Sequence, residues 1–465
     1  MKFTIENVGP IKKSEMVFGD LTVLCGRNNT GKTYITYNTF NYMDAIKYFL
    51  HIPVNNKHAE ELLESGKLLL DLEPFFQKAN KYIEKSMSVW IERESARQMA
   101  SHEDYYKSIT MKLELENKRL ENILNESNFN APLQMTKDCI LNVSKKKNEK
   151  ILKIILQNNS AKLPDIDVVS GQLGSLLKAM IRSIIPDLFI ITCERTGAAA
   201  FMPTFVASRE IAAKQNNDTK LMEDVYHKMD FRGYPRPMNK DLEFVVRFPE
   251  AISQKSFIAE KHPEILGYFS ELVGGEYCFE DPNVVKFVPK YTNIGLTTVE
   301  SSSSVRSLME LNFYLKHKAK KFQALIIDEP ELNLHPENQR KMARLIVMLI
   351  NAGLYVAITT HSDYIIREFD FMTRLFGKDD LAQKLGYTKD QLLNSNRIKT
   401  YVVQNNKNST QYELAEIAVD QEVGIESSSF DSSIEEMNLI QQAIQFGDVP
   451  SDDDFTIIEK NQKGE

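Results

Sequence analysis

The chain has 465 residues, a formal net charge of −7 and 26% charged residues, a composition typical of globular proteins and unlike that of disordered chains. The acidic balance gives no overall electrostatic reason to expect nucleic-acid binding, although a local basic groove stays open. No stretch reaches the roughly 18 uncharged apolar residues of a membrane helix, and the N-terminus lacks the pattern of a signal peptide. The four cysteines form no C-x-x-C pair. We therefore expect a cytoplasmic protein with no membrane contact and with reduced cysteines.

Three strands are predicted at the start of the chain, at residues 2–8, 13–18 and 21–25, because apolar and β-branched runs are separated there by Gly-Pro and Gly-Asp turns. The sequence GRNNTGKT follows at residues 26–33 and matches the pattern G-x4-G-K-[ST]. Residues 34–49 then favour a helix. A buried strand, this loop and a helix together form the context that a phosphate-binding loop requires.

Each residue type in this loop suits the binding of a nucleoside triphosphate. The glycines let the chain curl so that main-chain N–H groups face phosphate oxygens. Lys32 reaches the β- and γ-phosphates, and the hydroxyl of Thr33 can ligate Mg²⁺. The predicted ATP contacts are Gly26, Arg27, Asn28, Asn29, Thr30, Gly31, Lys32 and Thr33.

Residues 53–185 are predicted to form an insertion that is helical with some strand. Apolar residues spaced by three and four positions between residues 76 and 90 predict an amphipathic helix, and alternation at residues 109–115 predicts a strand. Residues 119–158 fit either helix or strand. A nearly continuous apolar run at residues 188–193 then predicts a strand buried on both faces.

Arg195 follows that strand, within the sequence ERTG. Polar groups at the end of a buried strand often face a ligand crevice, so Arg195 is a candidate phosphate or interface contact. A structural ion pair with an acidic neighbour would explain the arginine equally well. The sequence leaves both interpretations open.

Two later strands end in residues that can do chemistry. Residues 324–327 are apolar and run into two carboxylates, of which Asp328 stands at the strand end, where Mg²⁺ needs a ligand. Glu329 is one position further and can accept a proton from an attacking water. Another apolar run ends at His361, which can contact a γ-phosphate or hold the water. The sequence therefore predicts Glu329 and His361 as catalytic residues, and Thr33 and Asp328 as metal ligands.

The remaining segments are less informative. Four serines precede a predicted helix at residues 307–315, and taken alone they would be N-caps. Residues 398–450 are predicted to form a C-terminal lobe of strands and one helix. The acidic, apolar-poor tail at residues 451–465 is predicted to be disordered. The principal domain, or head, would then comprise residues 1–52 and 186–397.

Taken in order, the motifs GRNNTGKT, SSSSVR, LIIDEPELNLHP and TTHS resemble those of ABC-type ATPase heads of the SMC, RecF and OLD-like group. The GxN start of the first motif and the EPExxLHP run are similar to those of prokaryotic AAA family ATPases in that group. ERTG at residues 194–197 and HSDYII at residues 361–366 look like sequences in ATPase subunits of antiphage defence systems such as Septu and PARIS. The resemblance implies an α/β head in which helices flank a mixed β-sheet.

The same resemblance implies a role for each motif. Residues 26–33 would be the Walker A loop, and Asp328 and Glu329 the Walker B pair. Residues 333–335 would be the D-loop, and His361 the switch histidine. The signature loop, which would bind ATP across a head-to-head dimer, would consist of Ser302, Ser303 and Ser304. Serines replace the glycines of transporter-type heads in this loop, and we expect slow ATP hydrolysis.

Three functional classes remain open. In the first, the chain is an ATP-gated sensor or scaffold of an antiphage complex and controls a separate effector nuclease of the HNH or Toprim type. The second is a RecF- or SMC-like DNA-repair ATPase that binds DNA directly, and the third is the nucleotide-binding subunit of a transporter. The resemblance favours the first. No nuclease centre is predicted in the chain itself, because no further carboxylate cluster lies at the end of a predicted strand.

Overall fold

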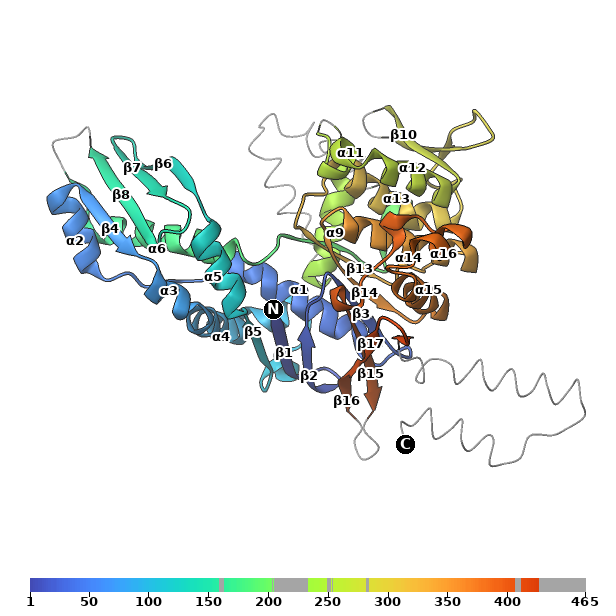
Figure 1. The fold of residues 1–465 in the computed structure, drawn as a ribbon, viewed down its shortest axis with the longest axis horizontal. Helices are drawn as coiled ribbons and strands as arrows, with labels where there is room; N and C mark the ends of the chain where they lie inside the picture. Colours follow the sequence, from blue (N-terminus) through green and yellow to red (C-terminus); the bar gives the residue numbers. More distant parts are fainter. Residues whose placement is uncertain are drawn as a thin grey trace, which may run out of the picture.

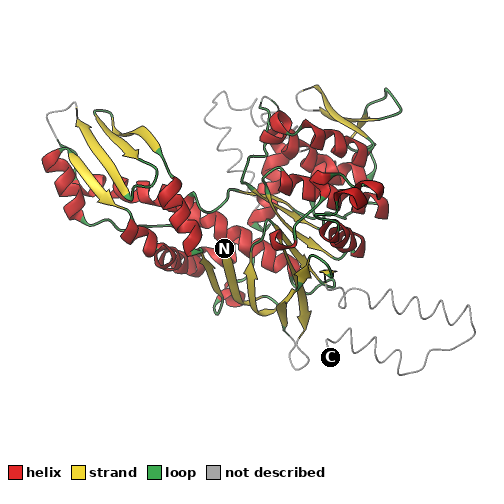
Figure 2. Ribbon diagram, in the orientation of Figure 1, coloured by secondary structure: helices red, strands yellow, loops and turns green. Residues whose placement is uncertain are grey.

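A nine-stranded mixed sheet forms the centre of the molecule, with the strand order β5-β1-β2-β16-β15-β3-β14-β13-β9. The computed structural model describes residues 1–158, 163–202, 204, 233–248, 252, 254–281, 284–405 and 411–425. Helices pack around the sheet (Figures 1 and 2), which confirms the predicted α/β architecture. Among the described residues, no helix is both long and apolar enough to cross a membrane.

Five neighbouring strands of this sheet are parallel and include the strand that leads into the GRNNTGKT loop. They are β15 (Ile398–Asn405), β3 (Leu21–Cys25), β14 (Tyr355–Thr360), β13 (Ala324–Asp328) and β9 (Leu188–Ile191). Their sequences are almost continuously apolar because both faces of the sheet are covered. Val23 and Ile327 belong to the core on one face, whereas Leu24 and Ile326 belong to the core on the other.

The other four strands extend the sheet on one side. They are β16 (Tyr412–Ile417), β2 (Ile11–Val17), β1 (Lys2–Val8) and β5 (Thr110–Glu114). Strand β16 is antiparallel to β15 and parallel to β2, while β1 is antiparallel to both β2 and β5. This arrangement joins segments from the two ends of the chain and from the insertion into one sheet.

Helices cover both faces of the sheet. The core on one face takes side chains from α1 (Lys32–Phe49) and α4 (Ala79–Gln98), and the core on the other from α9 (Arg236–Val246), α12 (Pro263–Val273), α13 (Ser303–His317), α14 (Pro336–Asn351) and α15 (Asp363–Arg374). Two shorter helices are α11 (Phe257–Lys261) and α16 (Asp379–Lys384). The small antiparallel sheet near them consists of β10 (Gly275–Asp281), β11 (Val284–Pro289) and β12 (Leu296–Thr297).

The insertion contains a second sheet, which lies to one side of the head at the left of Figure 1. This antiparallel sheet is ordered β4 (Lys67–Asp71), β8 (Ile151–Asn158), β7 (Cys139–Lys145), β6 (Phe129–Thr136). The helices of the insertion are α2 (Asn56–Ser65), α3 (Glu73–Gln77), α4, α5 (Asn117–Glu126) and α6 (Ile166–Arg182). The ambiguous segment thus begins within a helix and continues as three strands, since β7 and β8 pair with each other.

The C-terminal part differs from the sequence expectation. A separate lobe was expected from residue 398 onward, but β15 and β16 pair inside the main sheet. The reason is pairing between strands that are far apart in the sequence. Strand β15 hydrogen-bonds to β3, and β16 hydrogen-bonds to β2, so the N–H and C=O groups along these strand edges are paired within the main sheet. Strands β17 (Val419–Asp420) and β18 (Gly424–Ile425) follow. The expected helix of this lobe and the acidic tail lie outside the described residues.

Candidate functional site

Three parallel strands bring the predicted site residues to one edge of the sheet. Thr360 on β14 lies beside Cys25 on β3, and Asp328 on β13 lies beside Thr359 on β14. Because carboxyl ends of parallel strands meet at one edge, the loop at residues 26–33, the turn after Asp328 and His361 all start there. Ligands of open α/β sheets bind at such an edge.

The loop at residues 26–33, here called the phosphate loop, curls through three positive-φ residues: Gly26 (138°), Asn29 (61°) and Gly31 (103°). A side chain at Gly31 would strain the backbone, and its Cβ would lie 2.8 Å from both Pro10 Cγ and Ile11 Cδ1. Only glycine fits this position. Helix α1 begins directly afterwards, at Lys32, so its N-terminal dipole end faces the loop.

Lys32 is held inside this loop. Its Nζ donates to the main-chain carbonyls of Gly26 and Arg27, at 2.8 Å each, and the residue is only 6% exposed. Burial lowers the pKa of Lys32, while the nearby carboxylates of Glu329 and Asp328 act in the opposite direction. The ammonium therefore stands among neutral acceptors that a triphosphate, with its charged oxygens, could outcompete.

Thr33 and Asp328 form the candidate metal site. Thr33 Oγ1 lies 3.5 Å from Asp328 Oδ2, and Thr359 Oγ1 donates a hydrogen bond to Asp328 Oδ1. Asp328 is buried, and burial raises the pKa of its carboxyl. One carboxylate and one hydroxyl suit Mg²⁺, which takes hard oxygen ligands and completes its shell with waters and substrate phosphates. Among the described residues no group of three or more His, Cys, Asp or Glu could hold a metal alone.

Glu329 and His361 lie beside this pair. Glu329 has a left-handed backbone, with φ of 51°, and its N–H donates to the carbonyl and hydroxyl oxygens of Thr359, at 3.1 Å each. His361 Nδ1 lies 3.7 Å from Glu329 Oε1. Both side chains are partly exposed, at 28% for Glu329 and 43% for His361. A water or phosphate could reach both of them.

Glu331 is a site residue that the sequence reasoning missed. It is 5% exposed, and its Oε1 accepts from the His361 N–H and from Thr360 Oγ1, at 2.8 Å each. The same oxygen lies 3.3 Å from His361 Nδ1. The sequence feature that could have identified Glu331 is its position as the third residue of the EPE triplet at residues 329–331. Glu331 therefore anchors the end of β14 and the side chain of His361.

The predicted signature serines begin helix α13. Ser302 is the N-cap and accepts from the N–H of Val305 at 3.3 Å, so the N-cap interpretation is confirmed. Ser302 and Ser304 share a hydrogen bond of 2.8 Å between their hydroxyls. Ser302 and Ser303 are exposed. The cap thus leaves hydroxyl groups at the exposed N-terminus of a 15-residue helix.

The predicted D-loop links the turn after β13 to helix α14. Asn333 has a φ of 61°, and its Nδ2 donates to Thr196 Oγ1 at 3.2 Å. His335 is the N-cap of α14 and accepts from the N–H of Glu337 at 3.4 Å.

Arg195 does not face a phosphate crevice, and it lies near two buried carboxyl groups, those of Asp241 and Glu310, with which it interacts electrostatically. It is 3% exposed, and its hydrogen bonds go to main-chain carbonyls rather than to a carboxylate. A side chain enclosed in this way does not face a phosphate crevice.

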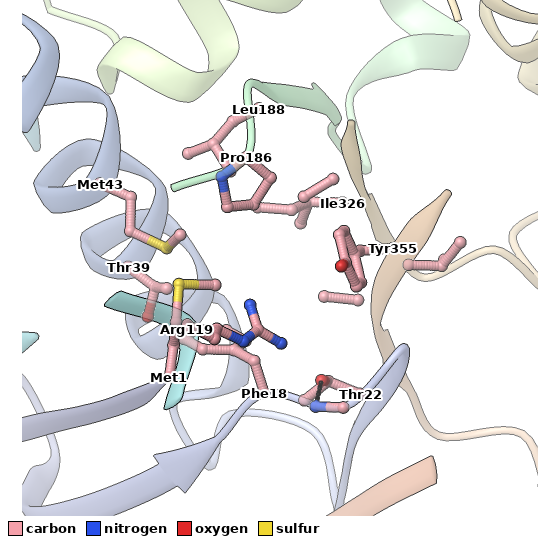
Figure 3. Close-up of a pocket in the computed structure, with 14 residues that line it drawn as sticks. Met1, Phe18, Thr22, Thr39, Met43, Arg119, Pro186, Leu188, Ile326 and Tyr355 are labelled. Atoms are coloured by element: carbon pink, nitrogen blue, oxygen red, sulfur yellow. Dashed lines mark hydrogen bonds between the residues drawn. The ribbon is translucent and has the colours of Figure 1, made fainter. Parts of the chain in front are cut away.

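A small cavity lies at the opposite, N-terminal ends of the parallel strands (Figure 3). The guanidinium of Arg119 points into it, 5.9 Å from the centroid of the Tyr355 ring. Its volume is about 30 Å³, which is room for one or two waters and far too little for a nucleotide. The cavity is therefore not part of the candidate nucleotide site.

Comparison with known proteins places the chain in a family. Residues 1–366 match the model of the AAA ATPase domain, and no curated protein matches the chain. One similar solved structure is an Smc head bound to the C-winged helix domain of ScpA, with 12% identity, 90% of this chain and 97% of that chain covered, and a TM-score of 0.35. Another is an Smc head with an extended coiled coil, bound to the C-terminal domain of ScpA from Pyrococcus furiosus, with 11% identity, 96% and 98% covered, and a TM-score of 0.31.

A third similar structure is the SMC head domain from Thermotoga maritima, with 12% identity, 90% of this chain and 98% of that chain covered, and a TM-score of 0.30. TM-scores between 0.30 and 0.35 support no argument about the function of this chain. The family model, in contrast, covers most of the chain, including the phosphate loop, Asp328 and His361. The chain belongs to the AAA ATPase domain family.

Proposed function

We propose that the chain binds ATP with Mg²⁺ at the edge formed by β3, β13 and β14 and hydrolyses it to ADP and phosphate. The observation that carries the proposal is the convergence of Lys32, Thr33, Asp328, Glu329 and His361 at that edge. A structural role alone would not explain why buried carboxylates stand next to a partly desolvated lysine at a strand end, where each charge costs solvation free energy.

Each residue has a role in this reaction. Lys32 exchanges its carbonyl acceptors for β- and γ-phosphate oxygens, and main-chain N–H groups of the phosphate loop donate to the same group. Thr33 and Asp328 would hold Mg²⁺, which when bound neutralises phosphate charge. Glu329 accepts the proton of the attacking water, and His361 beside it holds that water or the γ-phosphate. Glu331 keeps His361 in place.

The second part of the proposal is a head-to-head dimer. The N-terminus of α13 offers exposed hydroxyl groups and the positive end of a helix dipole, a combination suited to phosphate. In a head-to-head pair, Ser302, Ser303 and Ser304 of one copy would close over the ATP held by the other. ATP would then stabilise the dimer because it contacts both chains.

The third part concerns the biological role. By its motif resemblance, the chain acts as the sensor or scaffold subunit of a bacterial antiphage complex, and its ATP state controls a separate effector nuclease of the HNH or Toprim type. The insertion lobe offers surface beyond the head for such a partner. The alternative is a RecF- or SMC-like repair ATPase that binds DNA directly.

One set of assays tests these parts. The purified chain is incubated with ATP and Mg²⁺, and with plasmid and linear DNA in Mg²⁺ or Mn²⁺. The proposal expects slow phosphate release and intact DNA. Absence of ATP hydrolysis would overturn the first part. DNA cleavage that survives repurification would refute a separate effector, and tight ATP-dependent DNA binding by the chain alone would favour the repair alternative.

A further inference from the structure

Arg195 is a buried residue next to the candidate site, and the proposed reaction assigns it no role. It follows β9 and is enclosed between three elements of the site. Its Nη1 donates to the carbonyl of Asp328 at 2.7 Å and its Nη2 to the carbonyl of Glu329 at 2.5 Å. Its Nε donates to the carbonyl of Ser307 at 3.1 Å. One guanidinium thus connects the turn that carries the general base with helix α13.

The bond to Glu329 matters because that residue is strained. A left-handed backbone at a residue other than glycine costs free energy and persists only when the surroundings hold it. The N–H of Glu329 is held by Thr359, and its carbonyl is held by Arg195. The conformation of Glu329 places its carboxylate within 3.7 Å of His361 Nδ1. Arg195 therefore stabilises the orientation of the general base through the main-chain carbonyl of Glu329.

The bond to Ser307 extends the same link to the signature serines. Ser307 lies on α13, whose N-cap is Ser302 and whose first turn contains Ser303 and Ser304. The neighbouring Thr196 accepts from Asn333 of the D-loop at 3.2 Å. The segment after β9 that carries Arg195 and Thr196 thus contacts the signature helix, the turn after β13 and the D-loop, which are separate in sequence.

The surroundings of Arg195 suit an arginine better than a lysine. Asp241 and Glu310 are fully enclosed nearby and interact electrostatically with the guanidinium. Arg195 donates to the carbonyl of Thr192 as well, at 2.8 Å. A planar fork with five N–H groups can reach four carbonyls at once, whereas the ammonium of lysine has three donors from a single atom.

We infer that Arg195 is a positioning residue: it holds Glu329 in its left-handed conformation and couples that conformation to the signature helix of the same chain. In a head-to-head dimer the signature serines of a chain contact the partner's ATP, while its Glu329 acts on its own. Arg195 thereby makes hydrolysis in one site depend on closure of the other. The inference rests on the proposed ATP hydrolysis and head-to-head dimer, and it goes beyond both by naming Arg195 as the residue that couples the two sites.

The test uses the full chain and the variants Arg195→Lys and Arg195→Gln, with Arg397→Lys as the matched control. Arg397 is a partly buried arginine that, like Arg195, donates to a main-chain carbonyl, that of Ile350, and it pairs with Asp20 at the opposite end of the sheet. ATP affinity, kcat and melting temperature are measured for each. We expect unchanged ATP affinity and a kcat lowered by about 10- to 100-fold for the Arg195 variants, because small misplacement of a reacting group has costs of this size. Arg397→Lys should lower only the melting temperature.

A double-mutant cycle then tests the coupling itself. Ser302→Ala is made in the wild type and in the better-folded Arg195 variant, and kcat is compared. If Arg195 carries the link, Ser302→Ala costs much less in the variant background than in the wild type. The inference is overturned if the two effects multiply, if kcat stays at the wild-type value, or if neither Arg195 variant folds, which would make the role structural. Failure of the wild type itself to hydrolyse ATP would instead remove the proposed function.

Discussion

Thr33 Oγ1 lies 3.5 Å from Asp328 Oδ2, although 295 positions separate the two residues. The contact exists because β3 and β13 are both neighbours of β14 and end at the same edge of the sheet. It brings a hydroxyl from the first turn of α1 to a carboxylate at the end of a buried strand. This is the oxygen pair around which the proposed Mg²⁺ site is built.

Asp328→Asn should raise the melting temperature of the chain while lowering its rate of ATP hydrolysis. Burial disfavours the charged form of the Asp328 carboxyl and raises its pKa, so a neutral amide of the same shape should raise the melting temperature of the nucleotide-free chain. ATP hydrolysis should fall, and half-maximal activity should require more Mg²⁺. Differential scanning fluorimetry and a Mg²⁺ titration of phosphate release measure the two effects. A variant with wild-type Mg²⁺ dependence would contradict the metal assignment.

Glu329→Gln should keep ATP binding but slow hydrolysis by about 10²- to 10⁴-fold, the usual cost of losing a general base. ATP that is bound but not hydrolysed should then hold two heads together. Light scattering with and without ATP measures this assembly, and Glu337→Gln, an exposed substitution in the first turn of α14, serves as the control. A monomeric Glu329→Gln chain in saturating ATP would rule out closure of the site by a second copy.

Glu331→Gln tests the residue that anchors His361. The amide can still accept from the Thr360 hydroxyl and the His361 N–H, so the fold should be retained, but the charge facing the imidazole is lost. We expect kcat to fall by about 10-fold with unchanged ATP affinity. Glu331→Ala leaves those donors unsatisfied and should cost about 1–3 kcal/mol of stability as well. Wild-type kcat in Glu331→Gln would limit Glu331 to a structural role.

Glu310→Gln should change how stability depends on pH. Burial raises the pKa of Asp241 to about 6 and the pKa of Glu310 well above its ordinary value. Carboxyls with a raised pKa stabilise the fold most when protonated, so their contribution is complete below the ordinary pKa of about 4 and is lost as pH rises through the raised one.

The melting temperature of the wild type should therefore fall as pH rises from about 4 through the pKa of Asp241 at about 6, and that of Glu310→Gln, which cannot ionise at this position, should fall less. Glu243→Gln, on the same helix as Asp241 but with a partly exposed side chain, should follow the wild type. Parallel pH curves for all three proteins would show that the buried pair is not the source of the dependence.

Local sequence patterns were sufficient to predict where the candidate site residues lie in the fold. The phosphate loop, Asp328, Glu329 and His361 each follow an apolar run that ends abruptly, and parallel strands ending at one edge bring such residues together. The helix after the loop begins at Lys32, where Gly31 with its positive φ serves as the N-cap. These features depend on neighbours in sequence, so the sequence could predict them.

Hydrogen bonds to main-chain carbonyls, and the pairing of strands far apart in the chain, could not be predicted from local residue patterns. The ERTG and EPE sequences contain Arg195 and Glu331, but the hydrogen-bond partners of these residues depend on the turn after β13, where Glu329 and Asn333 have positive φ. The pairing of β15 with β3 and of β5 with β1 likewise depends on segments far apart in the chain. Strands of this kind are specified by their partners, and their own sequences fit a separate lobe equally well.

The central claim is that the phosphate loop binds ATP, and Lys32→Ala tests it most directly. Isothermal titration of the wild type with ATP and Mg²⁺ should give saturable binding. Removing the ammonium should weaken binding by at least about 100-fold, since two charge-assisted hydrogen bonds are lost. Lys47→Ala, a substitution at the far end of the same helix that breaks ion pairs with Asp44 and Asp187, should bind as the wild type does. Equal affinity of Lys32→Ala and the wild type would contradict the account.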